Sequence, residues 1–262
     1  MLRTRVLSAI VLIPVTAALV YLGGWWFTAA ILVAAGLAGF EFFRLMGQAN
    51  VVANWPIGLG MIATLVVGAA QPAWANAIGL LFTLFLMASL VWHMLQKGRP
   101  APGSDWVVTV AGAIYLGWLG GRFVALRELP NGMLWLALAL ISTWITDSGA
   151  YFVGRRWGRR KLAPRLSPKK TWEGAVGGWL IGVALTPLAA LLLGLPWYHG
   201  LGIGILAATV SPFGDLAESM FKRQVSAKDS SNLIPGHGGM LDRVDSLLFV
   251  IPAAFYYVLL LA

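Results

Sequence analysis

Carboxylates and basic residues suited to phosphate chemistry are concentrated between Ser219 and Asp245. This stretch, SMFKRQVSAKDSSNLIPGHGGMLDRVD, contains four basic residues, three acids, one histidine and three glycines. Asp242 and Asp245 are three residues apart, so they share one face if the segment is helical. Proteins hold Mg²⁺ with one or two carboxylates plus phosphate oxygens and water, whereas zinc would need a second histidine near His237. The stretch therefore predicts a magnesium site, although the two acids could instead only cap a helix.

Two further carboxylates lie upstream, at the ends of apolar runs. Asp147 stands in ISTWITDSGAYFVG, and an acid at the centre of a membrane span costs about 2.5–3.5 kcal/mol. We expect it to face inward toward a partner or a cation, the alternative being an ordinary acid at a helix end. Asp215 follows Pro212 and Gly214, which can loosen a helix, and a carboxylate at a broken helix can seat a cation. Both acids join the candidate metal ligands.

A basic segment precedes these acids. GRRWGRRKLAPRLSPKKTWEG has eight basic residues between positions 155 and 170. Membrane topology and anionic lipid are enough to explain its arginines. Lys169 and Lys170 differ, because they directly precede a predicted helix that Thr171 could cap, and helix N-termini favour phosphate. The P-loop pattern GxxxxGK[ST] is absent, so this is a different kind of phosphate contact.

The remaining candidate ligands belong to the Ser219–Asp245 stretch itself. If a helix resumes at Asp215, that residue shares a face with Glu218 and Lys222. The candidates are polar side chains and loop glycines: Ser219, Lys222, Arg223, Lys228, Gly238, Gly239 and Arg243. Acids for Mg²⁺ beside bases for phosphates suit phosphoryl or nucleotidyl transfer, in which positioning and electrostatics dominate catalysis.

The composition sets these residues in a membrane. The chain has 262 residues, of which 59% are hydrophobic and 11% charged, against about 25% charged in soluble domains. Mean hydropathy is +0.78, as in polytopic membrane proteins. Without cysteine, disulfides and Cys-ligated metal sites are excluded. The net charge of +9 indicates anionic headgroups or phosphorylated ligands rather than nucleic acid.

Hydropathy predicts an all-α polytopic membrane protein with about nine transmembrane helices. The N-terminal run resembles a signal peptide, yet a second apolar run begins at Trp25, so we expect a retained first helix. Breaks at Gly, Pro and charged residues delimit nine candidate spans: 6–22, 25–43, 55–71, 74–95, 106–121, 132–152, 175–194, 198–215 and 246–261.

The placement of charge predicts orientation and division of labour. A cytoplasmic N-terminus puts all 19 Lys and Arg residues except Arg122 and Arg127 on the cytoplasmic side. This bias favours an odd number of spans and a cytoplasm-facing site. Seven of the ten acids lie after residue 140. We therefore expect residues 1–130 to be a transmembrane scaffold and 131–262 a catalytic transmembrane region, within one continuous membrane domain.

A family resemblance adds what spacing cannot. The pattern S219-x-F-K-R-x4-K-D-x-S-x2-I-P-x-H-G-G-M-x-D-R-x-D245 resembles the signature of phosphatidate cytidylyltransferases (CDP-diacylglycerol synthases) over all its 27 residues. D147-S-G-A-Y151, S167-P-K-K-T-W-E-G174 and G214-D-L216 are similar to other segments of that family. The resemblance implies that CTP and phosphatidate give CDP-diacylglycerol and pyrophosphate with Mg²⁺, a second cation being left open.

The resemblance also implies roles for residues. Asp215 and Asp242 become the leading metal ligands, followed by Asp147 and Asp245. Because the attacking lipid phosphate is already anionic near pH 7, His237 is a phosphate or loop contact rather than a base. The bases that would meet substrate phosphates are Lys169, Lys170, Lys222, Arg223 and Arg243. The resemblance further suggests a homodimer in a bacterial-type inner (plasma) membrane, with the active site facing the cytoplasm.

Two other functions are compatible with parts of this pattern. A CTP-using lipid kinase, for example one acting on polyprenols, would share the basic loops but lack the full HGG-x-x-DR-x-D pattern. A transporter for a phosphorylated metabolite or a divalent cation would place charges near mid-membrane in two symmetry-related halves. Here the charges gather in the second half of the chain without an internal repeat.

Overall fold

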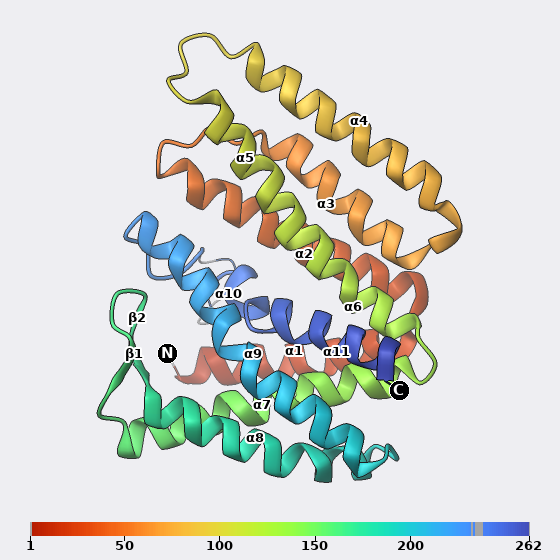
Figure 1. Cartoon of the computed structure of the whole chain (residues 1–262), viewed down its shortest axis with the longest axis vertical. Coiled ribbons are helices and arrows are strands. Elements are labelled where there is room, and N and C mark those ends of the chain that lie inside the picture. The colour runs from red at the N-terminus through yellow and green to blue at the C-terminus, as the bar shows by residue number, and fades with distance from the viewer. Residues whose placement is uncertain (1, 232, 234–237, 262) are drawn as a thin grey trace. The chain divides into compact units, whose positions relative to one another are not determined.

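The computed structural model describes residues 2–231, 233 and 238–261, and the chain in it is predominantly helical (Figure 1). Two compact units are formed, each described here by itself. Unit 1 comprises Met1–Ala125 and Gln224–Arg243, and unit 2 comprises Leu126–Arg223 and Val244–Ala262. Each unit is thus assembled from two stretches of chain that are far apart in sequence.

Unit 1 is a set of apolar helices closed by a polar loop. Its helical elements are α1 (Leu2–Leu22), α2 (Gly24–Gly47), α3 (Trp55–Ala70), η1 (Pro72–Trp74), α4 (Ala75–Met94), α5 (Pro102–Ala113), η2 (Ile114–Trp118) and the first part of α6 (Leu119–Glu128). α3 packs closely because Gly39 on α2 and Gly117 on η2 leave room at Ile62, whose Cα lies only 2.9 Å from where a Cβ of Gly117 would stand. Small residues at helix contacts are typical of membrane bundles.

Unit 2 carries the remaining elements. They are α7 (Gly132–Trp157), β1 (Lys161–Ala163), β2 (Ser167–Thr171), α8 (Trp172–Leu192), α9 (Trp197–Gln224) and α11 (Leu247–Leu261), preceded by α10 (Leu241–Val244), which spans the boundary with unit 1. β1 and β2 pair as an antiparallel hairpin with Lys161 opposite Thr171. This hairpin was not expected from the sequence, which predicted helices alone. The other elements named here are helical, as predicted.

A ladder of glycines on α8 brings it against α7. Gly174, Gly178 and Gly182 recur every fourth residue and therefore share one face of the helix. A Cβ at Gly178 would stand 2.7 Å from the Thr146 carbonyl oxygen, and one at Gly174 would stand 2.8 Å from the Ala150 carbonyl oxygen. Side chains larger than hydrogen would separate the helices. Figure 1 shows α7 and α8 running side by side from the hairpin that joins them.

The nine predicted spans all overlap helices, and the chain is confirmed as an all-α protein of membrane type. Within the described residues, seven helices are long and apolar enough to cross a membrane: Gly24–Gly47, Pro72–Met94, Pro102–Glu128, Gly132–Trp157, Trp172–Leu192, Trp197–Gln224 and Leu241–Leu261. Ile13–Leu22 and Trp55–Ala70 are apolar but shorter. The number of crossings and the cytoplasmic N-terminus remain predictions, as does the division into scaffold and catalytic region.

Candidate active site

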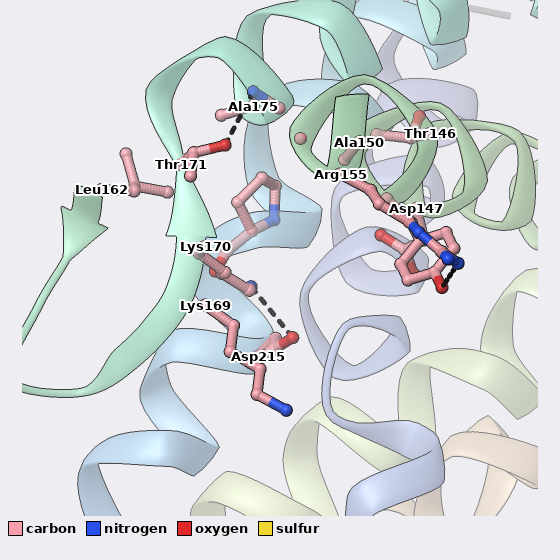
Figure 2. A pocket seen from close by; sticks show the side chains of 14 residues that line it. Thr146, Asp147, Ala150, Arg155, Leu162, Lys169, Lys170, Thr171, Ala175 and Asp215 are labelled. Carbon is pink, nitrogen blue, oxygen red and sulfur yellow. Dashed lines mark hydrogen bonds and ion pairs between the residues drawn. The ribbon is translucent and has the colours of Figure 1, made fainter. Parts of the chain in front are cut away.

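A cavity of about 480 Å³ opens in unit 2 between α7, the β hairpin and the middle of α9. Its lining combines acids, bases and small residues: Thr146, Asp147, Ala150, Tyr151, Gly154, Arg155, Leu162, Lys169, Lys170, Thr171, Gly174, Ala175, Pro212 and Asp215. Figure 2 shows lining residues from α7, from the β hairpin, from the start of α8 and from α9. The cavity therefore unites three segments that the sequence analysis had selected separately.

An ion pair between Lys170 and Asp215 crosses the cavity. Lys170 Nζ lies 2.9 Å from Asp215 Oδ2 and 3.5 Å from the Pro212 carbonyl oxygen (Figure 2). The two side chains are 25% and 37% exposed. An ion pair this accessible is partly screened by solvent and contributes only about 0–1 kcal/mol to stability. Either partner can therefore exchange the other for a phosphate or a cation at small cost.

Two serines of α9 hold the acids of the cavity. The Ser211 hydroxyl donates to Asp147 Oδ1 at 2.8 Å, and the Ser219 hydroxyl donates to Asp215 Oδ1 at 3.3 Å. α9 runs without a break from Trp197 to Gln224, with Pro212 inside it. The expected loosening before Asp215 is therefore wrong. A continuous helix places Asp215 and Ser219 one turn apart, which explains their contact.

Asp245 belongs to the same group of acids. It lies in the turn between α10 and α11, and its Oδ1 accepts the backbone N–H of Ser246 at 2.7 Å. This turn approaches α9 at Gly214, where an added Cβ would stand 2.5 Å from the Asp245 carbonyl oxygen. Gly214 thus permits a close approach instead of breaking a helix. The charge of Asp245 interacts with those of Asp215, Asp147 and Lys222.

The expected helical face shared by Asp242 and Asp245 is not formed. Asp242 lies within α10, which ends at Val244, and Asp245 follows in the turn. Asp242 is part of unit 1, whereas Asp147, Asp215 and Asp245 are part of unit 2. Of the four predicted metal ligands, unit 2 therefore contains three, and two of these, Asp147 and Asp215, line the cavity.

The oxygen donors of unit 2 fit Mg²⁺ better than a metal that needs a full protein cage. Among the described residues, no three Asp, Glu or His side chains stand close enough together to hold an ion by themselves. Mg²⁺ needs only one or two carboxylates because it keeps waters and takes phosphate oxygens. Asp147 and Asp215 both line the cavity, and their hard oxygens match that requirement.

The predicted phosphate-binding bases take different positions. Lys169 and Lys170 line the cavity from β2 and directly precede α8, as predicted. Thr171 is confirmed as the N-cap of α8, since its hydroxyl accepts the Gly174 N–H at 3.2 Å. Arg155 also lines the cavity and donates to the Tyr151 hydroxyl at 3.0 Å, a candidate that the sequence analysis had treated as topology only.

Two bases near the end of α9 have protein partners. Lys222 is buried, with its Nζ 2.5 Å from Glu218 Oε2. Arg223 Nε donates to the Leu166 carbonyl oxygen at 2.9 Å, which ties the β hairpin to α9. Glu173 holds the other side of that segment, accepting the backbone N–H groups of Arg159 and Arg160 at 2.9 and 3.1 Å. The hydrogen bond from Arg223 to Leu166 thus supports the β hairpin, which forms one wall of the cavity.

The remaining predicted residues lie in unit 1. Lys228 and Arg243 are exposed there, and His237 lies outside the described residues. Asp242 Oδ2 accepts the Ser230 N–H at 2.9 Å, the Ser230 hydroxyl at 2.8 Å and the Gly239 N–H at 2.8 Å. Gly238 has a φ of +81°, and its Cβ would stand 2.7 Å from Asp242 Oδ2. The paired glycines of the pattern let the backbone wrap around this carboxylate.

One acid that the sequence analysis missed is buried against the same loop. Glu41 on α2 is 4% exposed and accepts hydrogen bonds from Ser230, Ser231, Met240 and Leu241. A usable signal was present, because Glu41 is the only acid in the first 100 residues and stands in the apolar run GFEFFRL. The rule that selected Asp147, an acid within an apolar span, applies equally to Glu41.

Comparison with known proteins identifies the family. The sequence model of the Cytidylyltransferase family matches residues 3–261. A phosphatidate cytidylyltransferase of Bacillus subtilis is 35% identical, with 97% of each chain covered. One from Brucella suis is 39% identical over 98% of this chain and 92% of its own, and one from Pseudomonas aeruginosa is 37% identical over 96% and 95%. The chain therefore belongs to the cytidylyltransferase family and, within it, to the phosphatidate cytidylyltransferases.

Proposed function

We propose that this protein transfers the cytidylyl group of CTP to phosphatidate, giving CDP-diacylglycerol and pyrophosphate in phospholipid biosynthesis. Similarity over nearly the whole chain to proteins that bear this name supports the assignment. The observation that carries it is the cavity of unit 2, where bases suited to phosphates and acids suited to a cation line the same space. The elements around that space are apolar helices, as a bilayer substrate requires.

The proposed reaction needs little proton transfer. A phosphate oxygen of phosphatidate forms a bond to the α-phosphorus of CTP, and the bond from that phosphorus to the oxygen bridging to the β-phosphate breaks. The electron pair leaves with pyrophosphate. A phosphate monoester has its second pKa near about 6, so the nucleophile is already anionic at neutral pH. Catalysis then rests on orienting two phosphates and on neutralising their repulsion.

The described residues suggest how the cavity would do this. Lys169 and Arg155 carry positive charge at the cavity wall and would neutralise phosphate oxygens. Lys170 would exchange Asp215 for a phosphate, since their accessible pair is 2.9 Å long. The serines that hold Asp147 and Asp215 would keep both carboxylates aimed into the cavity.

Mg²⁺ is proposed as the cofactor. Asp147 and Asp215 would hold it in the cavity of unit 2, and Asp245 and Asp242 stay candidate ligands on the strength of the sequence pattern. When bound, the ion would stabilise the negative charge that develops between the α- and β-phosphates. The acids that flank the cavity are the reason for preferring an oxygen-ligated divalent cation to zinc.

The proposed reaction takes place at a membrane. Bacterial relatives and several long apolar helices support a multi-pass bacterial membrane protein. We propose further that the cavity faces the cytoplasm, where CTP is found, and that the protein acts as a homodimer. The excess of Lys and Arg from Arg155 to Lys170 supports the first of these proposals.

A labelling experiment tests the function. Purified protein in detergent is given phosphatidate, Mg²⁺ and CTP labelled at either the α- or the γ-phosphate. Label from the α position should enter the lipid, and label from the γ position should appear in pyrophosphate. A CTP-using lipid kinase would instead transfer the γ label to lipid, and a transporter would transfer neither. Either of those results would overturn the proposal. Glu128→Gln, an exposed change in α6, should give the same labelled products as the wild type.

A further inference from the structure

Glu41 accepts hydrogen bonds from the segment between α9 and α10, of which residues 225–231, 233 and 238–240 are described. This segment is called the polar loop of unit 1. Glu41 Oε1 accepts the Ser231 hydroxyl at 2.6 Å and the Met240 N–H at 3.0 Å. Its Oε2 accepts the Leu241 N–H at 2.8 Å and lies 3.1 Å from the Ser230 hydroxyl, whose single proton it shares with Asp242 Oδ2. A buried carboxylate is costly unless it is fully hydrogen-bonded, and these four donors provide that compensation.

All four donors come from one remote segment. They lie 189 to 200 residues further along the chain than Glu41. Helix α2 is 24 residues long and belongs to the part of the chain that was expected to be scaffold. Its buried carboxylate therefore fixes residues 230, 231, 240 and 241, all of which precede Asp242 in the segment that carries the family pattern.

The hydrogen bonds of Glu41 and Asp242 are interlocked. The Ser230 hydroxyl lies 2.8 Å from Asp242 Oδ2 and 3.1 Å from Glu41 Oε2. Three successive backbone N–H groups are divided between the two carboxylates, Gly239 donating to Asp242 and the next two to Glu41. A displacement of the loop from Glu41 must therefore also displace the donors of Asp242.

The crowding at Gly239 shows how little play this arrangement has. A Cβ there would collide with the Ser230 hydroxyl and with Glu41 Oε2, and would stand 2.7 Å from the Glu41 carboxyl carbon. Backbone, hydroxyl and both carboxylates thus occupy one close-packed volume, in which a shift of one group is transmitted to the others.

We propose that Glu41 is a positioning residue that acts through Asp242: it holds the loop so that the Asp242 carboxylate keeps the orientation required for the cytidylyl transfer. This rests on the proposed function, in which Asp242 is a candidate cation ligand. Glu41 itself touches no substrate in this proposal. Its contribution is the fixed geometry of Ser230 and of the 239–241 backbone.

The test combines a double-mutant cycle with a measurement that needs no substrate. Glu41→Gln keeps the size of the side chain but loses its charge and turns an amide N–H toward backbone donors. We expect kcat to fall about 10- to 100-fold, as for loss of about 1.4–2.8 kcal/mol, with the KM for CTP changed less than about twofold. Asp242→Asn should lower kcat further. The double variant should be no slower than Asp242→Asn alone, because residues acting as one unit are non-additive.

Hydrogen exchange of the protein without substrate gives the second readout. In Glu41→Gln the amides of Gly239, Met240 and Leu241 should exchange at least about tenfold faster than in the wild type, with Glu128→Gln as the unchanged control. If Glu41→Gln does not fold, Ser231→Ala takes its place. That change removes one donor to Glu41 and leaves the three bonds to Asp242 Oδ2, so a two- to fivefold loss of kcat is expected.

Several outcomes would overturn the inference. One is a kcat and an amide exchange rate like those of the wild type in Glu41→Gln, or in Ser231→Ala where that variant replaces it. Another is a double variant in which the effects of the two changes on kcat multiply. A wild-type kcat in Asp242→Asn would also overturn it. The failure of the proposed function looks different, because wild-type protein would then form no CDP-diacylglycerol. The exchange experiment would still report whether Glu41 holds the loop.

Discussion

The chain contains two groups of carboxylates that are held in opposite ways. In unit 1, Glu41 and Asp242 accept hydrogen bonds from neutral donors, namely backbone N–H groups and serine hydroxyls. In unit 2, Asp215 pairs with a lysine and lines a cavity, and Asp147 lines the same cavity with one serine behind it. Residues of one type therefore serve two purposes. Neutral donors build a rigid loop, whereas an accessible cation leaves a carboxylate ready to exchange its partner.

The difference teaches how to separate acids that the fold holds in one orientation from acids that can exchange their partner. A carboxylate surrounded by several protein donors has most of its hydrogen-bonding capacity used within the fold. One that shares a cavity with lysines has a partner that a phosphate can displace. Changes in unit 1 should therefore affect stability and rate together, while changes in unit 2 should affect the reaction and leave stability nearly unchanged.

The largest effect is expected from removing the charge of Asp215. Asp215→Asn takes away a proposed cation ligand and the partner of Lys170, so turnover should fall by about 100-fold or more. Stability should change by less than about 1 kcal/mol, because the pair is accessible. Product formation from CTP and phosphatidate, measured beside thermal unfolding in detergent, checks both. A variant that loses its fold as well as its rate would break the distinction between the two groups.

In unit 1, a single methyl group should harm stability and rate together. Gly239→Ala would press on Ser230 and Glu41, and overpacking of this kind costs about 1–3 kcal/mol. We expect a lower unfolding temperature and about a tenfold loss of kcat. Gly79→Ala in α4 is the control, since a Cβ there meets nothing within 4 Å. If Gly239→Ala unfolds like the control, the loop is less tightly packed than its geometry indicates.

The lysines of β2 should affect binding more than turnover. Lys169→Ala or Lys170→Ala removes a charge-assisted contact worth about 1.5–3 kcal/mol, so the KM for CTP should rise about 10- to 100-fold. Lys161→Ala is the matched control, because Lys161 is exposed on β1 of the same hairpin and is absent from the cavity lining. Unchanged KM values for both substrates would remove the two lysines from the site.

The smallest effect is expected at Ser211. Its hydroxyl donates a hydrogen bond to Asp147 at 2.8 Å, and Ser211→Ala should lower turnover by less than about tenfold. Asp147 would remain beside the cavity with its charge intact. Steady-state kinetics with each substrate in turn measure the effect. A loss as large as that of Asp215→Asn would indicate that orientation of Asp147 matters as much as the presence of a carboxylate.

Local sequence signals predicted much of this molecule. Hydropathy located every long helix, and the cap at Thr171 was readable because capping depends on residues three apart. The β hairpin was missed, since its strands are short and basic and depend on remote contacts such as Arg223 with Leu166. Pro212 was misread as a break, although α9 continues through it.

Long-range contacts were the part that the sequence could not reveal. The hydrogen bonds between Glu41 and the loop join residues that are 189 or more positions apart. A hydrophobic pattern within one segment cannot predict such contacts. Three of the predicted acids lie in unit 2, where Asp147 and Asp215 line one cavity, but the partner of each acid could not be predicted. That allocation depends on tertiary packing, which places donors beside Asp242 and a lysine beside Asp215.

The glycine ladder of α8 has a consequence for how such an enzyme can fail. Contact with the α7 backbone is made at two successive turns of α8, at Gly174 and Gly178, so the spacing of Asp147 from the hairpin lysines is set largely by main chain. A methyl group added at Gly178 would push α8 away from α7 at Thr146, the residue next to Asp147. It would swing the acid away from the bases while every polar residue of the site stayed in place, and a survey of catalytic residues alone would judge that variant intact.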